Sequence, residues 1–322
     1  MSSGRLRTLI ALVGVPIGLL FLWLAVRNAD LDAVWDTLRD ADMGLVALAI
    51  AAFGVVYLFQ SARWRRIASV PRVRIARFYE MTVSGVAVNN VLPGRIGDFL
   101  RARWLGIASG MAGGKAFGTV ILDRAFDLVT LVGLLIVGIA AVASSEWLVQ
   151  LAAAGAVVVL GFAAVVLFSR TYIARRDRHR HERGLVRGLV RDTVERLAEP
   201  LGRRHLLVWL ALSLGAWAMW AVAALFIARS LGIELSLAEA LFVTAVLNLG
   251  SAVPSSPGYV GTYEWLGVAS LGLLDIDHEP ALAFTILLHA AWYVPTTLFG
   301  AVALGTRGVV QLRHRRAAAA PH

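Results

Sequence analysis

The chain has 322 residues, of which 58% are hydrophobic and only 16% charged, and this balance excludes an ordinary soluble globular protein. A net charge of +10 would suit a nucleic-acid-binding protein, but the charges lie in short loops between long apolar runs, which is typical of a membrane protein and argues against nucleic acid as a partner. The chain has no cysteine, which excludes disulfides and thiolate metal sites.

Long apolar segments predict that the fold is all-α and polytopic. A helix needs about 20 apolar residues to cross the hydrocarbon core of a bilayer. Six segments meet this requirement: residues 8–26, 43–62, 116–142, 147–168, 205–228 and 281–305. We therefore expect six transmembrane helices in a single integral membrane domain over residues 1–322. Segment 8–26 is read as a span rather than as a cleaved signal peptide, because it is longer than a usual signal-peptide core.

Two further apolar stretches, 78–114 and 237–276, are each broken by a Pro-Gly pair into pieces too short to cross comfortably. We expect each to form a re-entrant hairpin. With its flanking spans, each hairpin forms one unit, and the unit occurs twice, at 43–142 and 205–305. The two units would enter the membrane from opposite sides as an inverted repeat. The alternative is that each stretch is a pair of kinked spanning helices.

Basic residues predict the orientation, because cytoplasmic loops are rich in Arg and Lys. Outside the spans, only Arg27, Arg39 and Arg229 fall in the loops that would face away from the cytoplasm. Both termini are then cytoplasmic and the localisation is the cell membrane. The basic loop 170–204 is equally consistent with an amphipathic helix on the inner leaflet and with a solvated linker.

The two hairpin tips share the pattern P-G-x-[I/V]-G, each preceded by an asparagine. Pro-Gly breaks a helix, and we expect Asp98 or Thr262 to cap the helix that follows. Free backbone amides at such a helix N-terminus favour an anion such as phosphate. The tip residues are Asn90, Pro93, Gly94 and Gly97 in the first hairpin and Pro257, Gly258 and Gly261 in the second.

Ionisable residues within apolar segments are rare and usually mark function or line a cavity. Around the first tip, Asp98 and Arg101 are three residues apart and can pair, while Arg95 and Arg101 could hold a phosphate. Arg103 lies in the same cluster. The alternative is that these arginines only anchor the chain at the cytoplasmic interface.

A second cluster is Asp123, Arg124 and Asp127, whose side chains fall within one arc of a helix. It fits either a polar transport path or a structural lock between helices. A D-x-x-x-D pair could also bind Mg²⁺, but no second acidic motif accompanies it, so no metal site is expected.

A third cluster joins Glu264, beyond the second tip, to His289 in the last span. An intramembrane carboxylate can carry protons or meet a cationic head group, whereas His289 beside aromatic residues is more often a hydrogen-bonded packing residue. No motif of a hydrolase, metalloprotease or nucleotide-binding loop is present. We therefore expect no covalent catalysis and no cofactor.

Three motifs together resemble the flippase-like family named after the transmembrane region of lysylphosphatidylglycerol synthase: Asn90-x-x-Pro93-Gly94-x-x-Gly97-Asp98-x-x-Arg101, Asp123-Arg124-x-x-Asp127 and Pro254-x-x-Pro257-Gly258-x-x-Gly261-x-x-Glu264. The resemblance covers about residues 8–305 and implies movement of lipids with substituted head groups, or of polyprenyl-linked sugars, between leaflets. Tyr259 departs from the pattern, since a second glycine is frequent there. No synthase domain follows residue 322, so aminoacyl transfer to lipid is not expected.

The resulting hypothesis is a lipid flippase or transporter that moves a phospholipid or polyprenyl-linked head group. Arg95, Asp98, Arg101 and Glu264 would bind the head group, and Asp123, Arg124 and Asp127 would line a polar path. The alternatives are an intramembrane enzyme and an accessory subunit of envelope-lipid or glycolipid synthesis. Membrane lipids are the expected partners, with envelope-lipid biosynthetic enzymes as further candidates.

Overall fold

The computed structural model describes residues 3–92, 95–142, 203–251 and 256–318, together with single positions between 150 and 193. All regular structure in this part of the chain is helical, as predicted. The span expected at 147–168 and the basic loop 170–204 lie largely outside the described residues, as do Pro93, Gly94 and Pro254.

The long apolar runs form the long helices. The bounds are α1 Ser3–Val26, α3 Met43–Ala68, α6 Gly113–Val142, α9 Arg203–Ser230 and α12 His278–Ala318. Three stretches of the described residues are long and apolar enough to cross a membrane by length and composition: Met43–Ala68, Arg204–Ser230 and His278–Thr306. The remaining predicted crossings stay predictions.

The connection between the segments predicted as spans at 8–26 and 43–62 contains a short helix, α2 Leu31–Arg39. Asp30 caps this helix, its side chain accepting hydrogen bonds from the backbone of Asp32 and Ala33. Buried Val34 packs against Leu282 at the start of α12. The acidic residues of this connection therefore form the helix start, at Asp30, and an exposed helix face, at Asp32 and Asp36.

Each interrupted stretch folds as a helical hairpin. The first consists of α4 Ile75–Val91 and α5 Ile96–Ser109, and the second of α10 Leu237–Gly250, the single turn η1 Pro257–Tyr259 and α11 Thr262–Gly272. The two helices of each hairpin pack against each other. Val73, just before α4, and Met111, just after α5, belong to one apolar cluster, so the first hairpin begins and ends at the same place.

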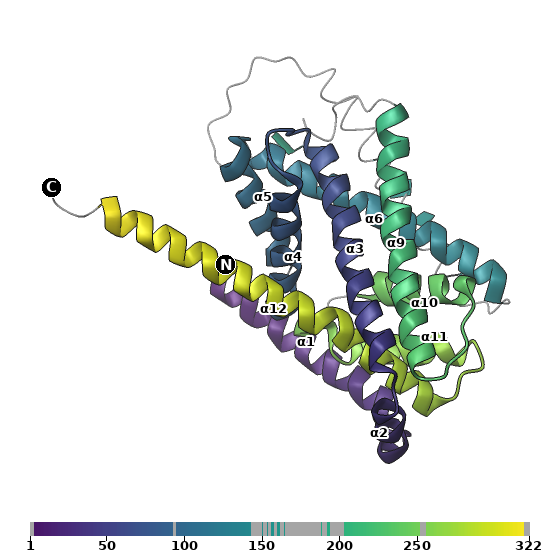
Figure 1. Cartoon of the computed structure of the whole chain (residues 1–322). Helices are drawn as coiled ribbons and strands as arrows, with labels where there is room; N and C mark the ends of the chain where they lie inside the picture. Colours follow the sequence, from purple (N-terminus) through teal and green to yellow (C-terminus); the bar gives the residue numbers. More distant parts are fainter. Residues whose placement is uncertain are drawn as a thin grey trace.

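The contacts between helices are the same in the two units. In the first unit α3 packs against α4 and α5 against α6, and in the second α9 packs against α10 and α11 against α12. Between the units, α4 packs against α12 and, correspondingly, α10 packs against α6. The first helices of the two units, α3 and α9, lie side by side over most of their length (Figure 1). They are antiparallel, because the amide of Asp42 before α3 donates to the carbonyl of Ser230 at the end of α9 at 3.0 Å.

The largest apolar core lies where these units meet. It includes Phe53 of α3, Trp220 of α9, Phe242 of α10 and Phe284 of α12, with Phe53 and Trp220 in an edge-to-face contact at 5.2 Å. The core fixes how the hairpins approach the long helices, which positions the polar groups described next.

Candidate functional site: a pocket and a ring of buried charges

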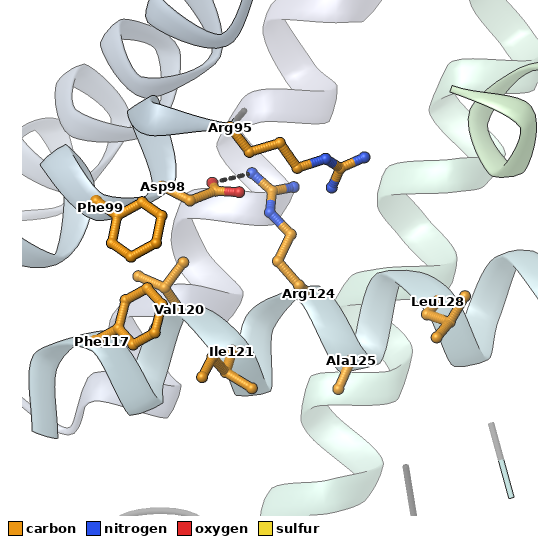
Figure 2. Close-up of a pocket in the computed structure, with 9 residues that line it drawn as sticks. All are labelled: Arg95, Asp98, Phe99, Phe117, Val120, Ile121, Arg124, Ala125 and Leu128. Carbon is orange, nitrogen blue, oxygen red and sulfur yellow. Dashed lines mark hydrogen bonds and ion pairs between the residues drawn. The ribbon is translucent and has the colours of Figure 1, made fainter. Parts of the chain in front are cut away.

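An open pocket of about 290 Å³ lies between α5 and α6. Its walls are mostly apolar and its polar groups are Arg95, Asp98 and Arg124 (Figure 2). Phe99 and Phe117 form one wall as a stacked pair, with ring centroids 4.8 Å apart. The remaining lining residues are Val120, Ile121, Ala125 and Leu128. A pocket with apolar walls and guanidinium groups at one end suits an amphipathic ligand with an anionic head.

The backbone at the tip of the first hairpin sets the position of Arg95. This residue precedes α5 in a left-handed conformation, with φ 53°, which is unfavourable for a residue with a side chain by about 1–2 kcal/mol. Tyr259, the third residue of the same motif in the second tip, has φ 63°. A left-handed backbone favours glycine, which explains why glycine suits the position of Tyr259.

The helix starts differ from those expected. Arg95 is the N-cap of α5 and Gly261 that of α11, so the prediction of Asp98 or Thr262 as cap was wrong. Asp98 instead faces inward from the first turn of α5 and bonds to side chains. Gly97 lies close to α4: its amide donates to Asn89 Oδ1 at 2.7 Å, and a Cβ at Gly97 would fall 1.9 Å from the carbonyl oxygen of Gly85.

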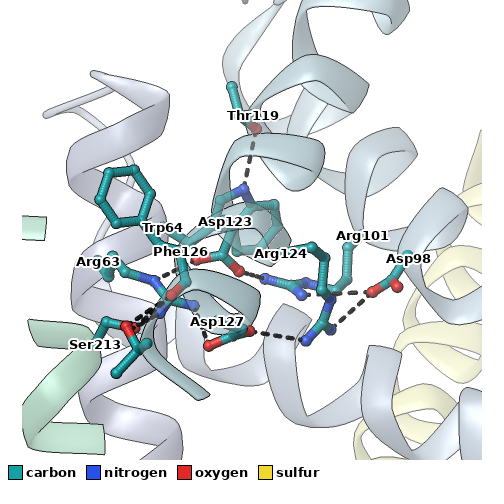
Figure 3. Close-up of polar contacts among 11 residues, drawn as sticks. Arg63, Trp64, Asp98, Arg101, Thr119, Asp123, Arg124, Phe126, Asp127 and Ser213 are labelled. Atoms are coloured by element: carbon teal, nitrogen blue, oxygen red, sulfur yellow. Dashed lines mark hydrogen bonds and ion pairs between the residues drawn. The ribbon is translucent and has the colours of Figure 1, made fainter. Parts of the chain in front are cut away.

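Asp98 and Arg124 belong to a closed ring of six alternating charges (Figure 3). Each member contacts an opposite charge on both sides. In order around the ring, with N–O distances, the contacts are Arg63–Asp123 at 2.9 Å, Asp123–Arg101 at 2.9 Å, Arg101–Asp98 at 3.5 Å, Asp98–Arg124 at 2.9 Å, Arg124–Asp127 at 3.2 Å and Asp127–Arg63 at 2.9 Å. Three arginines and three aspartates give the ring no formal net charge.

The neutrality of the ring matters because most of its side chains are buried. The side chains of Arg63, Arg101 and Asp123 are at most 1% exposed, and a buried charge is tolerated only when it is paired and hydrogen-bonded. Arg63 also donates to Ser213 of α9 at 2.6 Å. The Arg101 guanidinium lies 4.2 Å from the ring centroid of Trp64, a cation–π distance. The ring thus joins α3, α5, α6 and α9.

The structure brings together most of the residues that the sequence singled out, but in different roles. Asp98 and Arg101 pair as expected, and Asp123, Arg124 and Asp127 converge. Arg101 does not line the pocket: it is buried and engaged by two aspartates, so its direct contact with a phosphate is not what this structure presents. Arg124, with 30% of its side chain exposed, faces the pocket beside Arg95 instead. Arg103 is exposed outside the pocket.

Sequence reasoning missed Arg63 and Ser213. Arg63 directly follows the predicted span 43–62, so the orientation rule assigns it to a cytoplasmic loop; that interpretation is wrong, because Arg63 lies inside α3 with no exposed surface. Charge neutrality could have revealed it: three buried aspartates with only Arg101 and Arg124 leave one negative charge without a partner.

The carboxylate groups of the ring all contact arginine guanidinium groups. Both oxygens of Asp123 contact guanidinium groups, one from Arg63 and one from Arg101, and both oxygens of Asp127 do so as well. Among the described residues no cluster of three or more metal-ligating side chains occurs. The two aspartates therefore serve as partners for arginines in this arrangement.

A second polar group lies at the other hairpin. Glu264 Oε1 is 2.6 Å from His289 Nδ1, and its other oxygen, Oε2, accepts a hydrogen bond from the Gly261 amide at 2.5 Å. His289 packs between Tyr263, with ring centroids 4.4 Å apart, and Trp292, at 5.3 Å. The hydrogen-bonded packing expected for His289 is therefore present.

The two hairpin tips approach each other through α12. Asn90 donates from Nδ2 to Thr297 Oγ1 at 2.9 Å, and Tyr293 OH donates to the Asn90 carbonyl at 3.4 Å. The same tyrosine ring lies against Gly258 of the second tip, leaving no room for a Cβ there. Helix α4 also packs against η1, which begins at Pro257. One helix thus contacts both tips.

These features define a class: a helical membrane protein in which two helical hairpins are inserted between long apolar helices and enclose buried charges. More specifically, the chain belongs to the family described as the lysylphosphatidylglycerol synthase TM region, which it matches over residues 9–300. The resemblance carried by the three sequence motifs is confirmed.

Similar proteins include the archaeal glycosyltransferase AglD of Haloferax volcanii, which is 26% identical over 336 residues. That match covers 91% of this chain and 54% of AglD, so the chain spans about half the length of that relative. A UPF0104 membrane protein of Methanocaldococcus jannaschii is 24% identical over 218 residues, covering 67% of this chain and 92% of the relative. Another UPF0104 membrane protein, from Methanothermobacter thermautotrophicus, is 23% identical over 312 residues, covering 87% of this chain and 91% of the relative.

Proposed function

We propose that this protein is a lipid transporter of the flippase type that binds a phosphate-bearing lipid head group in the pocket between α5 and α6. The observation that carries the proposal is the pocket itself, with apolar walls and two arginines at one end. The phosphate is common to phospholipids and to polyprenyl-linked sugars, and both remain candidate substrates. No covalent step is part of the proposal.

Charge supports an anionic ligand. The ring of six is formally neutral, whereas Arg95 forms no ion pair with any described residue, so the pocket has one positive charge in excess. A phosphate oxygen can accept from Arg95 and from the exposed side of Arg124, and guanidinium–phosphate bonds are among the strongest hydrogen bonds in proteins. The acyl or prenyl chain would leave along Phe99, whose side chain is 55% exposed, and Phe117.

We further propose the predicted topology: six spans, two re-entrant hairpins and cytoplasmic termini in the cell membrane. The exchange of packing contacts between the two units and the antiparallel α3 and α9 support an inverted repeat. Because the chain has no cysteine, single cysteines can test this topology directly. Cysteines at Arg72 and Ala112, the two ends of the first hairpin, should react from one side of the membrane and a cysteine at Asp36 from the other. Reaction of Ala112 from the same side as Asp36 would contradict it.

A second candidate function is a role in glycolipid synthesis. It is favoured by the similarity to AglD, whose name describes a glycosyltransferase, although only about half of that protein is matched. The chain would then be an intramembrane enzyme or an accessory subunit that presents a lipid-linked sugar to a partner enzyme. Product formation by the purified protein alone would favour the enzyme, and lipid transfer without product would favour the transporter.

The proposed function is tested by leaflet transfer in proteoliposomes. Purified protein is reconstituted with a fluorescent anionic phospholipid, and the fraction accessible to an external quencher is followed with time. Arg95→Ala should reduce transfer to the rate of protein-free vesicles, because it removes the unpaired positive charge. Arg103→Ala is the matched control, since this exposed arginine on the same helix lies outside the pocket. Equal transfer by wild type and protein-free vesicles, or by Arg95→Ala and wild type, would overturn the assignment.

A further inference from the structure

In each of the two units of the fold, an acid on the second hairpin helix pairs with a base on the following long helix. In the first unit the pair is Asp98–Arg124, 26 residues apart, and in the second it is Glu264–His289, 25 residues apart. Both pairs contact at under 3 Å, at 2.9 and 2.6 Å. The two pairs therefore join corresponding helices, α5 to α6 and α11 to α12, in the exchanged contact pattern.

The chemistry of the two pairs differs in one respect. Arginine stays protonated in proteins, so Asp98–Arg124 is a permanent ion pair. Histidine can exist as neutral imidazole or as imidazolium, so Glu264–His289 can hold one proton more or one fewer. The pair is neutral overall when His289 is protonated and carries one negative charge when it is not. Of these two pairs, Glu264–His289 is thus the one whose charge can change.

The surroundings of His289 leave one of its two ring nitrogens without a partner and place Glu264 at the other. Its Nε2 atom is buried and has no hydrogen-bond partner among the described residues. Among the described ion pairs, Glu264 joins His289 and no arginine or lysine. The titratable groups that contact the imidazole ring are the phenols Tyr263 on α11 and Tyr293 on α12, and Tyr57 on α3 bonds to Thr296 of α12.

In the described parts of α2, α4 and α9, which also pack against α12, the charged side chains are exposed or paired elsewhere. On α4, Tyr79 contacts Phe299, ten residues beyond His289, and Arg77 is paired with Glu80. The charged groups of α2 are exposed, as are Arg204 and Arg229 at the ends of α9. Glu264 is therefore the charged group that faces the imidazole.

The pair is also connected to the hairpin tip. Glu264 accepts a hydrogen bond from the Gly261 amide at the start of α11. Gly261 in turn lies directly against α1, since a Cβ added to it would fall 1.9 Å from the carbonyl oxygen of Gly18. On α12, one turn after His289, Tyr293 contacts both tips. A change in the strength of the Glu264–His289 contact would therefore alter how α11 is held against α12.

We propose that Glu264 and His289 form a proton-binding site that is loaded and emptied in each transport cycle, coupling lipid movement to proton movement. A proton from water on one side binds the pair and converts it from one net negative charge to neutral. The same proton leaves to water on the other side when the hairpin and α12 separate. This inference rests on the proposed lipid transport.

The test uses proteoliposomes of wild-type protein with a fluorescent anionic phospholipid and a gradient of about one pH unit. Coupling to one proton sustains up to about a tenfold difference in lipid between leaflets, whereas uncoupled transfer equalises them. His289→Gln, which cannot carry the proton, should lose the response to the gradient. His278→Gln is the matched control, because His278 bonds to the Ala25 carbonyl at the start of α12, outside the pair. A wild-type distribution that ignores the gradient, or an unchanged response in His289→Gln, would overturn the coupling.

A second measurement separates this proposal from the proposed function. In ¹⁵N-histidine-labelled wild-type protein, with His289→Gln used for assignment, both the neutral and the protonated form of His289 should be detected as the pH is varied. An imidazole that stays in one form throughout would overturn the proton site even if lipid is transferred. Titration of His289 without any lipid transfer would instead refute the transport function and leave the proton site standing.

Discussion

Replacing Arg63 by glutamine should strongly destabilise the fold. The substitution removes contacts at 2.9 Å to Asp123 and Asp127 and a hydrogen bond at 2.6 Å to Ser213. It leaves two arginines against three aspartates, so one negative charge is buried without a partner. Breaking a buried ion pair from one side costs about 3–5 kcal/mol, and because the Arg63 side chain is 0% exposed, water cannot compensate. We expect Arg63→Gln to lower the free energy of unfolding by about that amount.

The measurement is unfolding of the purified protein in mixed micelles, followed by tryptophan fluorescence. Arg39→Gln, a change of an exposed arginine in α2, is the control and should stay within about 0.5 kcal/mol of wild type. The double variant Arg63→Gln/Asp123→Asn restores charge balance in the ring and should recover part of the loss, with a coupling energy of about 0.5–3 kcal/mol. Stability of Arg63→Gln equal to that of the Arg39→Gln control would refute the view that neutrality of the ring holds these helices together.

Three further predictions follow from other parts of the molecule. Gly261→Ala should destabilise the protein by about 1–3 kcal/mol, because φ is 90° and the new Cβ would meet the Gly18 carbonyl, whereas Gly272→Ala, with open space around it, should be near neutral; thermal unfolding distinguishes them. Ala125→Phe should fill the pocket and reduce lipid transfer to the rate of protein-free vesicles, while Ala108→Phe on the exposed face of α5 should transfer like wild type. Asn90→Ala should cost about 1 kcal/mol of unfolding free energy by removing the bond to Thr297, and a Thr297→Val background should abolish that difference.

The long helices are well predicted from sequence because an apolar run is a property of the segment alone. The runs 43–62 and 205–228 are contained in α3 and α9, which extend beyond them by a few residues. The extension matters, because Arg63 lies just past the end of the apolar run of α3. An arginine there has the same local sequence context as one in a cytoplasmic loop. Only its distant partners, Asp123 and Asp127, decide that it is buried.

The helix starts at the hairpin tips, in contrast to the long helices, are not well predicted from sequence. The shared pattern identified them, but the local backbone was predicted incorrectly at Asp98 and Thr262. Aspartate is a strong N-cap in isolation, yet the charge of Asp98 is needed by Arg101 and Arg124, so the helix starts earlier, after Arg95. The tertiary ion pairs therefore override the local preference.

The pocket could not be predicted from sequence at all. Its lining combines α5 with α6, and it exists because Phe99 and Phe117 stack while Arg95 takes a left-handed backbone. The sequence did identify Arg95 and Asp98 as candidates through their place in an apolar segment. The same reasoning chose Arg101 over Arg124 for the phosphate, because sequence spacing does not tell which side of a helix is covered by a neighbour.

Photo-cross-linking in the native membrane tests the central claim, that the pocket between α5 and α6 holds a phosphate-bearing lipid, most directly. A photoreactive phenylalanine analogue at Phe117, in the pocket wall, is compared with the same analogue at Ile107, whose side chain is 73% exposed and lies outside the pocket. Mass spectrometry of the adducts should show one class of phosphate-bearing lipid enriched at Phe117 relative to Ile107, and the enrichment should disappear in Arg95→Ala. Identical lipid adducts at the two positions would contradict the account.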